Sequence, residues 1–135
     1  MSANLIAASS QHAGQTGKAL NITLWILKIL AAGMFLLAGG LKLAGAAPMV
    51  AMFEQIGIGQ WFRYFTGGLE VACAVLLLIP GTSAIGAALL AATMVGAILT
   101  HLFIIGGSPA IPVILLLITS TVALTRWHAP SRRRG

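Results

Sequence analysis

The sequence predicts an all-α integral membrane protein, an antiparallel four-helix bundle with a short interfacial amphipathic helix between its first and second membrane-spanning helices. Of the 135 residues, 59% are hydrophobic and only 7% are charged, whereas a soluble domain has about 45–50% apolar and about 25% charged residues. The apolar residues also fall into four long runs. These observations exclude a soluble enzyme and a disordered chain, and a single cysteine excludes a disulfide scaffold.

Three regions follow from the pattern. Residues 1–18 are rich in Ser, Gln, Gly and Ala without a sustained apolar period, which predicts a flexible N-terminal tail. Residues 19–127 form the transmembrane domain, and 128–135 form a basic C-terminal tail. The first span runs from about Leu20 to Leu43, with Lys28 and Lys42 near its ends, where long side chains can snorkel toward the headgroups. Lys42 also argues against a cleaved signal peptide.

A short amphipathic helix is predicted between Pro48 and Gly57. Its apolar residues recur at helical spacing along one face, and they are Met49, Met52, Phe53 and Ile56. Proline suits a first helical turn and glycine a C-terminal stop. The aromatic residues after it, Trp61, Phe62 and Tyr64, are typical of the headgroup level.

The other three spans run from about Trp61 to Ile79, Ala84 to Ile105 and Ala110 to Trp127. The turns between them are short, so consecutive helices must be antiparallel neighbours. Four crossings place both termini on one side. Lys18 and the arginines at 132–134 make that side the cytoplasm, in a bacterial inner membrane. Basic residues at the ends of spans indicate topology and contact with the lipid bilayer, not nucleic acid.

Small residues recur every four positions along the third span. They are Ala84, Ala88, Ala92, Gly96 and Thr100. Such a stripe lets helix backbones approach closely, either inside the bundle or between copies in a homo-oligomer.

Four polar residues lie in one half of the membrane, the outer half in this topology. They are Lys42, Arg63, Glu70 and His101. A carboxylate in hydrocarbon costs at least about a few kcal/mol, so Glu70 must be protonated or paired, with Lys42 or Arg63 at its depth. Glu70 is then either a structural ion-pair partner or a proton-binding, ligand-orienting acid. His101 either bonds across helices or relays protons and binds a quinone carbonyl.

Other chemistry finds no support in the sequence. Neither cysteine nor carboxylate clusters have metal-ligand spacing, so no metal site is predicted. Without Asp there is no Ser-His-Asp set, and Cys73 lies in an apolar stretch typical of inert packing.

Four short motifs, in a fixed order along the spans, resemble those of a known family. They are the runs Phe35–Leu43, Trp61–Glu70, Leu99–Phe103 and Gly106–Pro109. Together they resemble the DoxX-like family of small four-helix membrane proteins over about residues 22–127. The resemblance implies a quinone-linked, redox-associated role, with no built-in cofactor and a quinone as candidate ligand. It supplies no settled catalytic residues, so whether the chain is an enzyme stays open.

Three functions are therefore weighed. The first is a redox-associated membrane subunit that binds a quinone or docks a protein partner carrying the redox cofactor; a lipid-facing opening near His101 and Glu70 would support it. The second is a non-enzymatic accessory or assembly factor, favoured by sealed polar contacts and an exposed apolar groove. The third is a small proton-coupled transporter, which needs a water path to Glu70.

Overall fold

The computed structural model describes the backbone of residues 2–127, and the side chains of Asn4 and of residues 17–127. Its elements are α1 (Ser2–Ala44), α2 (Ala47–Ile56), α3 (Trp61–Leu78), η1 (Pro80–Thr82), α4 (Ser83–Thr100), η2 (His101–Ile105) and α5 (Ala110–Trp127). No strand occurs between residues 2 and 127. The predicted all-α membrane fold is confirmed.

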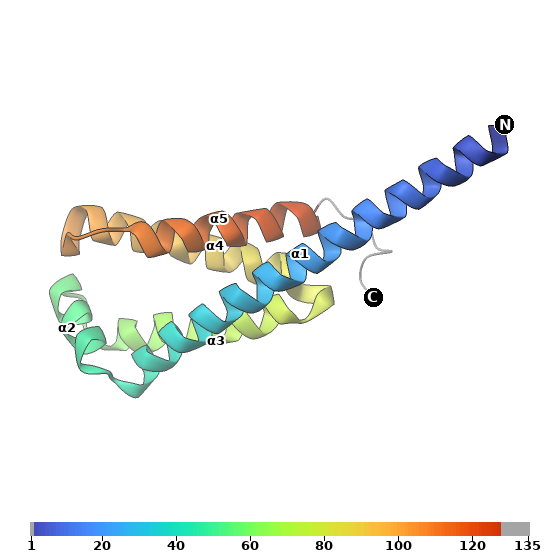
Figure 1. Ribbon diagram of the computed structural model, residues 1–135. Helices are drawn as coiled ribbons and strands as arrows, with labels where there is room; N and C mark the ends of the chain where they lie inside the picture. Colours follow the sequence, from blue (N-terminus) through green and yellow to red (C-terminus); the bar gives the residue numbers. More distant parts are fainter. Residues whose placement is uncertain (1, 128–135) are drawn as a thin grey trace.

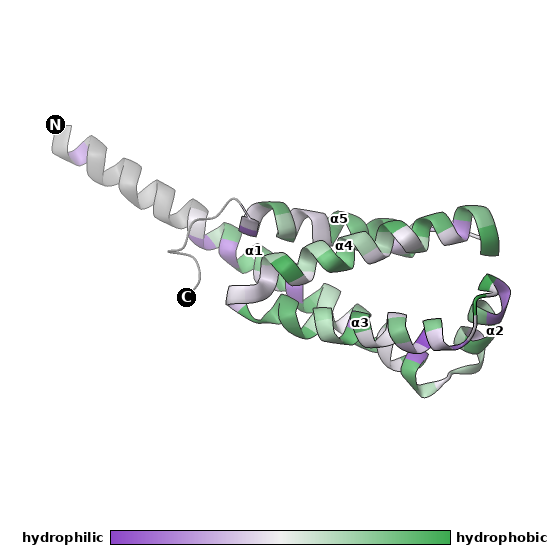
Figure 2. Cartoon of the chain, turned by 180° about the vertical axis from the view of Figure 1, so that it is seen from behind, coloured by the Kyte–Doolittle hydropathy of each residue, from purple (hydrophilic) through white to green (hydrophobic). Residues whose placement is uncertain are grey.

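Four stretches are long and apolar enough to cross a membrane: Gly17–Ala44, Trp61–Leu78, Pro80–Ile105 and Ala110–Trp127. Helix α1 packs beside α3 and α4 beside α5, and the two pairs join where α3 meets α4 and α1 meets α5 (Figure 1). Apolar residues cover the outside of these helices (Figure 2). We call the two ends of the bundle the α2 end and the Trp127 end.

Helix α1 begins much earlier than predicted. The expected tail over residues 1–18 is helical from Ser2 onward, and α1 runs without a break for 43 residues. Residues 2–18 contain no proline and several alanines, and a helix propagates easily from a turn that is already formed. The absence of an apolar period marks where the membrane span ends, not where the helix ends. The basic tail at 128–135 lies outside the described residues.

Helix α2 is amphipathic and buries the apolar face that the sequence predicts. Phe53 is buried and Met49, Met52 and Ile56 are half-buried, while Glu54 and Gln55 are exposed. Gly57, with φ +85°, ends the helix in the left-handed conformation that glycine adopts without strain.

The third span ends in a turn of π-helix that periodicity does not reveal. The amide of Gly106 donates to the carbonyl of His101 at 2.8 Å, five residues back. Gly106 and Gly107 then have φ values of +78° and +80° and stop the helix. Such π-turns are frequent at functional sites, and this one begins at His101.

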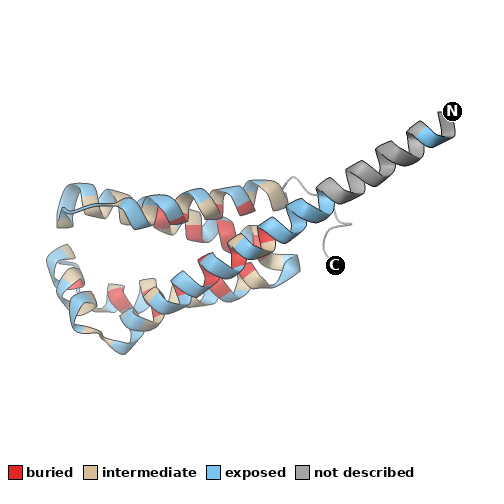
Figure 3. Ribbon diagram, in the orientation of Figure 1, coloured by how far each residue is buried: buried red, intermediate tan, exposed pale blue. Residues whose placement is uncertain are grey.

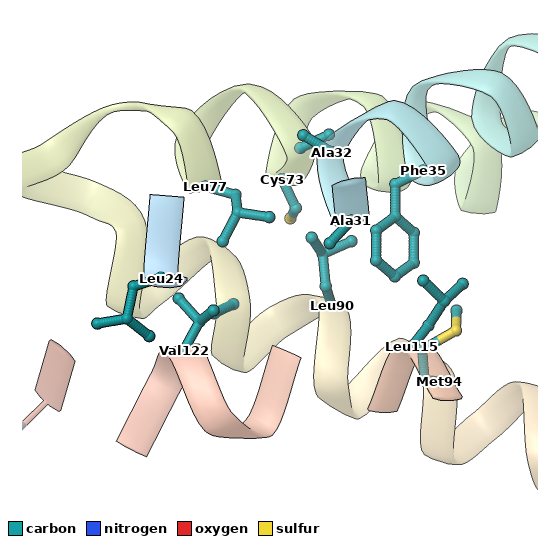
Figure 4. Packing of buried hydrophobic residues seen from close by; sticks show 12 residues of the cluster. Leu24, Ala31, Ala32, Phe35, Cys73, Leu77, Leu90, Met94, Leu115 and Val122 are labelled. Atoms are coloured by element: carbon teal, nitrogen blue, oxygen red, sulfur yellow. The ribbon is translucent and has the colours of Figure 1, made fainter. Parts of the chain in front are cut away.

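The buried core lies in the middle of the bundle and toward the Trp127 end (Figure 3). Phe35, Leu77 and Leu90 from three helices meet there (Figure 4). Between Met94 and Leu115 no residue is buried. The α4–α5 pair therefore diverges from the α1–α3 pair toward the α2 end (Figure 1).

The small-residue stripe does not pack inside the bundle. Helix α4 buries a different face, formed by Ser83, Gly86, Ala87, Leu90 and Met94. Ala88, Ala92 and Gly96 are exposed and Ala84 is half-buried. Small residues occur on two faces of this helix. The close α3–α4 crossing at Gly86 determines which of the two faces packs inside the bundle. Homo-oligomerisation through Ala84, Ala88, Ala92 and Gly96 stays a prediction.

This crossing yields a test. A Cβ atom at Gly86 would lie 2.7 Å from the amide nitrogen of Leu77 and 2.8 Å from the carbonyl oxygen of Cys73. We therefore expect Gly86→Ala to push α4 off α3 and to lower the free energy of unfolding in detergent by about 1–3 kcal/mol.

Gly96→Ala is the matched control, because a Cβ atom there meets nothing within 4 Å. It should leave the melting temperature unchanged or raise it slightly. Equal melting temperatures for the two variants would contradict the α3–α4 crossing.

Candidate functional site

Helices α1 and α3 cross at two glycines. A Cβ atom at Gly39 would lie 2.8 Å from the carbonyl oxygen of Gly67, and one at Gly67 would lie 3.0 Å from the carbonyl oxygen of Gly39. The backbones come this close because neither residue has a side chain. Each glycine also faces the next polar residue of the partner helix: Gly67 faces the Cβ of Lys42, and Gly39 faces the Cβ of Glu70.

This crossing places Lys42 against Glu70. The Lys42 Nζ atom lies 3.1 Å from Oε1 and 3.3 Å from Oε2 of Glu70. The Glu70 side chain is only 3% exposed and that of Lys42 is 12% exposed. A charge inside hydrocarbon is tolerated when an opposite charge answers it, so the pair ties α1 to α3 in one register.

Arg63 belongs to the same interface but has other partners. Its Nη1 donates to the backbone carbonyl of Lys42, and its Nε donates to Oε1 of Gln60 at 2.7 Å. The guanidinium lies over the ring of Tyr64, 4.3 Å from its centroid. Arg63 therefore satisfies a carbonyl at the C-terminal end of α1, where a cation is favourable. Between the two cations available to Glu70, the fold uses Lys42.

His101 stands apart from these three residues. Its Nδ1 lies 2.9 Å from the carbonyl oxygen of Ala97, one turn back on its own helix. Within residues 17–127 it makes no hydrogen bond or ion pair with Lys42, Arg63 or Glu70. The four candidate residues thus divide into a cluster on α1–α3 and a single histidine on the diverging end of the α4–η2 helix.

A contact from α2 joins these two parts. Gln55 on α2 donates from Nε2 to the carbonyl oxygen of Ile105 at 3.2 Å, and Gln60, ahead of α3, donates to the carbonyl oxygen of Val50 at 3.1 Å. Helix α2 is therefore tied both to the end of η2 and to the start of α3. It bridges the two helix pairs where they diverge.

Lys28 is a polar residue whose role sequence reasoning missed. It was expected to snorkel, yet its side chain is 1% exposed. Its Nζ lies 3.2 Å from Oγ of Ser83 and 3.8 Å from the ring centroid of Trp25. The helical spacing that places Lys28 on one face with Phe35 and Lys42 is the signal that it faces the bundle.

The chemical capacity of this arrangement is narrow. Both oxygens of Glu70 contact Lys42, so proton transfer to an outside molecule would first require the pair to open. Among the described residues, no three His, Cys, Asp or Glu side chains are grouped closely enough to hold a metal ion. Cys73 is buried in the apolar core. The α1–α3 cluster can hold helices together but exposes no reactive group.

A family model described as the DoxX-like family matches residues 26–123 of the chain. No curated protein and no solved structure matches it significantly. The matched range includes Lys28, Lys42, Arg63, Glu70 and His101.

The ion pair makes a quantitative prediction. Glu70→Gln removes the carboxylate and leaves Lys42 in hydrocarbon without an anion, which should lower the free energy of unfolding by about 3 kcal/mol. The single variant Lys42→Met should also lower the free energy of unfolding. The double variant Lys42→Met/Glu70→Gln should lower it by less than the sum of the two single variants, because it removes both charges. Unfolding in mixed detergent micelles measures each value.

Glu54→Gln serves as the control, because Glu54 is exposed on α2. It should change stability by less than about 0.5 kcal/mol. Additive effects of the Lys42 and Glu70 substitutions would rule out their pairing.

Proposed function

The chain belongs to the DoxX-like family of integral membrane proteins, and from that premise we propose that it is a non-catalytic, redox-associated accessory subunit of a membrane complex. In this role it docks a protein partner that carries the redox cofactor and performs no chemistry itself. Its ion-paired bundle is the rigid platform for that partner.

The main support for this proposal is that the polar side chains of the bundle are buried. The side chain of Glu70 is 3% exposed, and Arg63 and Lys28 are 5% and 1% exposed. An enzyme site presents polar groups to a substrate, whereas these groups are used by contacts within the bundle. Sealed polar contacts favour the accessory role over catalysis at Glu70.

The apolar pocket between α1 and α5 supports the same conclusion. It measures about 220 Å³ and is lined by Leu30, Met34, Ile111, Ile114, Leu115 and Ile118. Ligand sites usually combine apolar walls with a few placed polar groups that orient the ligand. This pocket has apolar side chains alone, so it suits a hydrocarbon chain or an aliphatic side chain rather than a reacting substrate.

Binding of a quinol, the reduced form of a quinone, at His101 is the second candidate, and one observation favours it. A carbonyl only accepts hydrogen bonds, so Nδ1 of His101 must carry the proton that it shares with Ala97. Nε2 of a neutral ring is then an acceptor, and among the described residues nothing donates to it. A quinol hydroxyl supplies such a donor at the half-buried end of the α4–η2 helix.

A proton-coupled transporter receives less support. On the Trp127 side of Glu70, the buried residues Phe35, Cys73 and Leu77 form a closely packed apolar core. Such a core gives water no polar partners.

For the topology of the chain, we propose a bacterial inner membrane with both termini in the cytoplasm. This orientation is based on Lys18 and the basic residues after Trp127.

The accessory role predicts where redox activity resides. The purified chain alone, in lipid nanodiscs, should not accelerate oxidation of a quinol by a soluble electron acceptor. In native membranes solubilised with a mild detergent, the chain should co-migrate with a complex that shows flavin, haem or iron–sulfur absorbance. Quinol oxidation by the isolated chain would contradict the proposal.

The quinol candidate predicts a residue-specific loss. If His101 binds a quinol, protein purified in mild detergent under reducing conditions should retain about one quinol per chain, and His101→Ala should lose it. Thr100→Ala is the matched control, because the Thr100 hydroxyl bonds only to the carbonyl of Gly96 in its own helix. Equal quinol content in both variants would eliminate His101 as the ligand.

A further inference from the structure

The two helix pairs are joined in different ways at the two ends of the bundle. At the Trp127 end the links are buried: the hydroxyl of Ser83 on α4 donates to the carbonyl oxygen of Leu77 on α3 at 2.7 Å, and Nζ of Lys28 on α1 donates to the Ser83 oxygen at 3.2 Å. The close backbone crossing of α3 and α4 at Gly86 lies one turn along α4. These buried contacts fix the two pairs against each other at this end.

At the α2 end, a single glutamine makes the link. Nε2 of Gln55 on α2 donates to the carbonyl oxygen of Ile105 at 3.2 Å and lies 3.5 Å from that of Ile104. Within residues 17–127, no other hydrogen bond or ion pair at this end joins the α4–α5 pair to α1, α2 or α3. Gln55 is exposed, so water or a lipid headgroup can replace its bond, and the bond adds little net stability.

Packing between the pairs also weakens toward the α2 end. The inward face of α4 continues by helical spacing from Leu90 and Met94, which are buried, to Ala97 and His101, which are only half-buried. On α5, Leu115 is the buried residue nearest this end. Segments with few buried apolar contacts are the ones that open locally in native proteins. Little therefore opposes separation of the pairs here once the glutamine releases.

Helix α2 is held much more firmly by α3 than by η2. Phe53 of α2 is 3% exposed and packs edge to face against Phe62 of α3, with ring centroids 5.8 Å apart. Gln60, ahead of α3, donates to the carbonyl oxygen of Val50 on α2 at 3.1 Å. The ion pair at the glycine crossing holds α1 against α3. Helices α1, α2 and α3 therefore form one arm, and α4, η2 and α5 form the other (Figure 1).

We propose that Gln55 is the latch of a gate that opens sideways into the membrane. When its bond to Ile105 breaks, the η2 end of the α4–α5 arm moves away from α2, and the buried contacts at Ser83 and Gly86 act as the hinge. The movement exposes the inner face of α4, at Ala97 and His101, to lipid-soluble molecules. The gate goes beyond the proposed accessory function and does not depend on it.

Thiol labelling of the full-length chain in lipid nanodiscs measures how often this face opens. The assay uses a Cys73→Ala background with one new cysteine, Ala97→Cys, and the membrane-permeant reagent N-ethylmaleimide. Gln55→Met keeps the length of the side chain and removes its donor. We expect it to raise the labelling rate of the Ala97→Cys thiol about two- to tenfold, which is the effect on an opening equilibrium of losing one net hydrogen bond.

Two controls separate opening of the gate from general loosening. Glu54→Gln alters the neighbouring exposed residue of α2 and should leave the rate at Ala97→Cys unchanged. Val95 is 45% exposed on the outside of α4, so Val95→Cys should be labelled equally fast with or without Gln55→Met. An unchanged rate at Ala97→Cys in Gln55→Met, or an equal rise at Val95→Cys, would overturn the gate.

Distances between pairs of spin labels, measured by electron–electron double resonance in the same background, test where the hinge lies. One pair replaces Leu43 on α1 and Phe103 on η2, near the α2 end, and the other replaces Leu20 on α1 and Leu124 on α5, near the Trp127 end. All four side chains are exposed. Gln55→Met should add longer distances to the first pair and leave the second pair unchanged. No lengthening in the first pair, or an equal change in the second, would contradict a gate hinged at the Trp127 end.

Discussion

A charge inside hydrocarbon needs an answering group from a neighbouring helix, and this requirement fixes how α1 and α3 meet. The glycine crossing brings the two backbones within contact, and Lys42 then reaches both oxygens of Glu70. Arg63 closes the same interface by binding the carbonyl of Lys42. The pair and the crossing depend on each other, because larger side chains at Gly39 or Gly67 would separate the charges.

The two ends of the bundle handle charge differently. Near the α2 end, the positive charge of Lys42 is answered by a carboxylate from the same chain. At the Trp127 end, Lys28 has only neutral partners. Lys28 and Lys42 are 14 residues apart on α1, or about 21 Å, which is less than the roughly 30 Å thickness of a hydrocarbon core. Both lysines therefore fit within one crossing of that core, and the contrast between them follows from where the two glutamates occur.

The sequence predicts much of this structure, for a physical reason. Hydrocarbon requires long apolar helices, so the spans and the α2 face could be located by composition and periodicity alone. The common face of Lys28, Phe35, Gly39 and Lys42, and the face of Arg63, Gly67 and Glu70, also follow from helical spacing. What spacing does not encode is which of two equivalent faces packs inward, as with Gly86 against Ala88 and Gly96. It likewise does not encode a π-turn at His101, the helical state of residues 2–18, or the choice of Lys42 over Arg63 as the partner of Glu70.

The most direct test measures the Lys42–Glu70 contact in a bilayer. Solid-state NMR on protein labelled with ¹⁵N at lysine Nζ and ¹³C at glutamate Cδ reports this contact. A Glu54→Gln background leaves Glu70 as the single labelled carboxylate. The N–O separations of 3.1 and 3.3 Å predict a measurable nitrogen–carbon dipolar coupling, which should disappear in Lys42→Met and persist in Lys28→Met. Absence of coupling in the parent protein would contradict the account of how this bundle holds its charge.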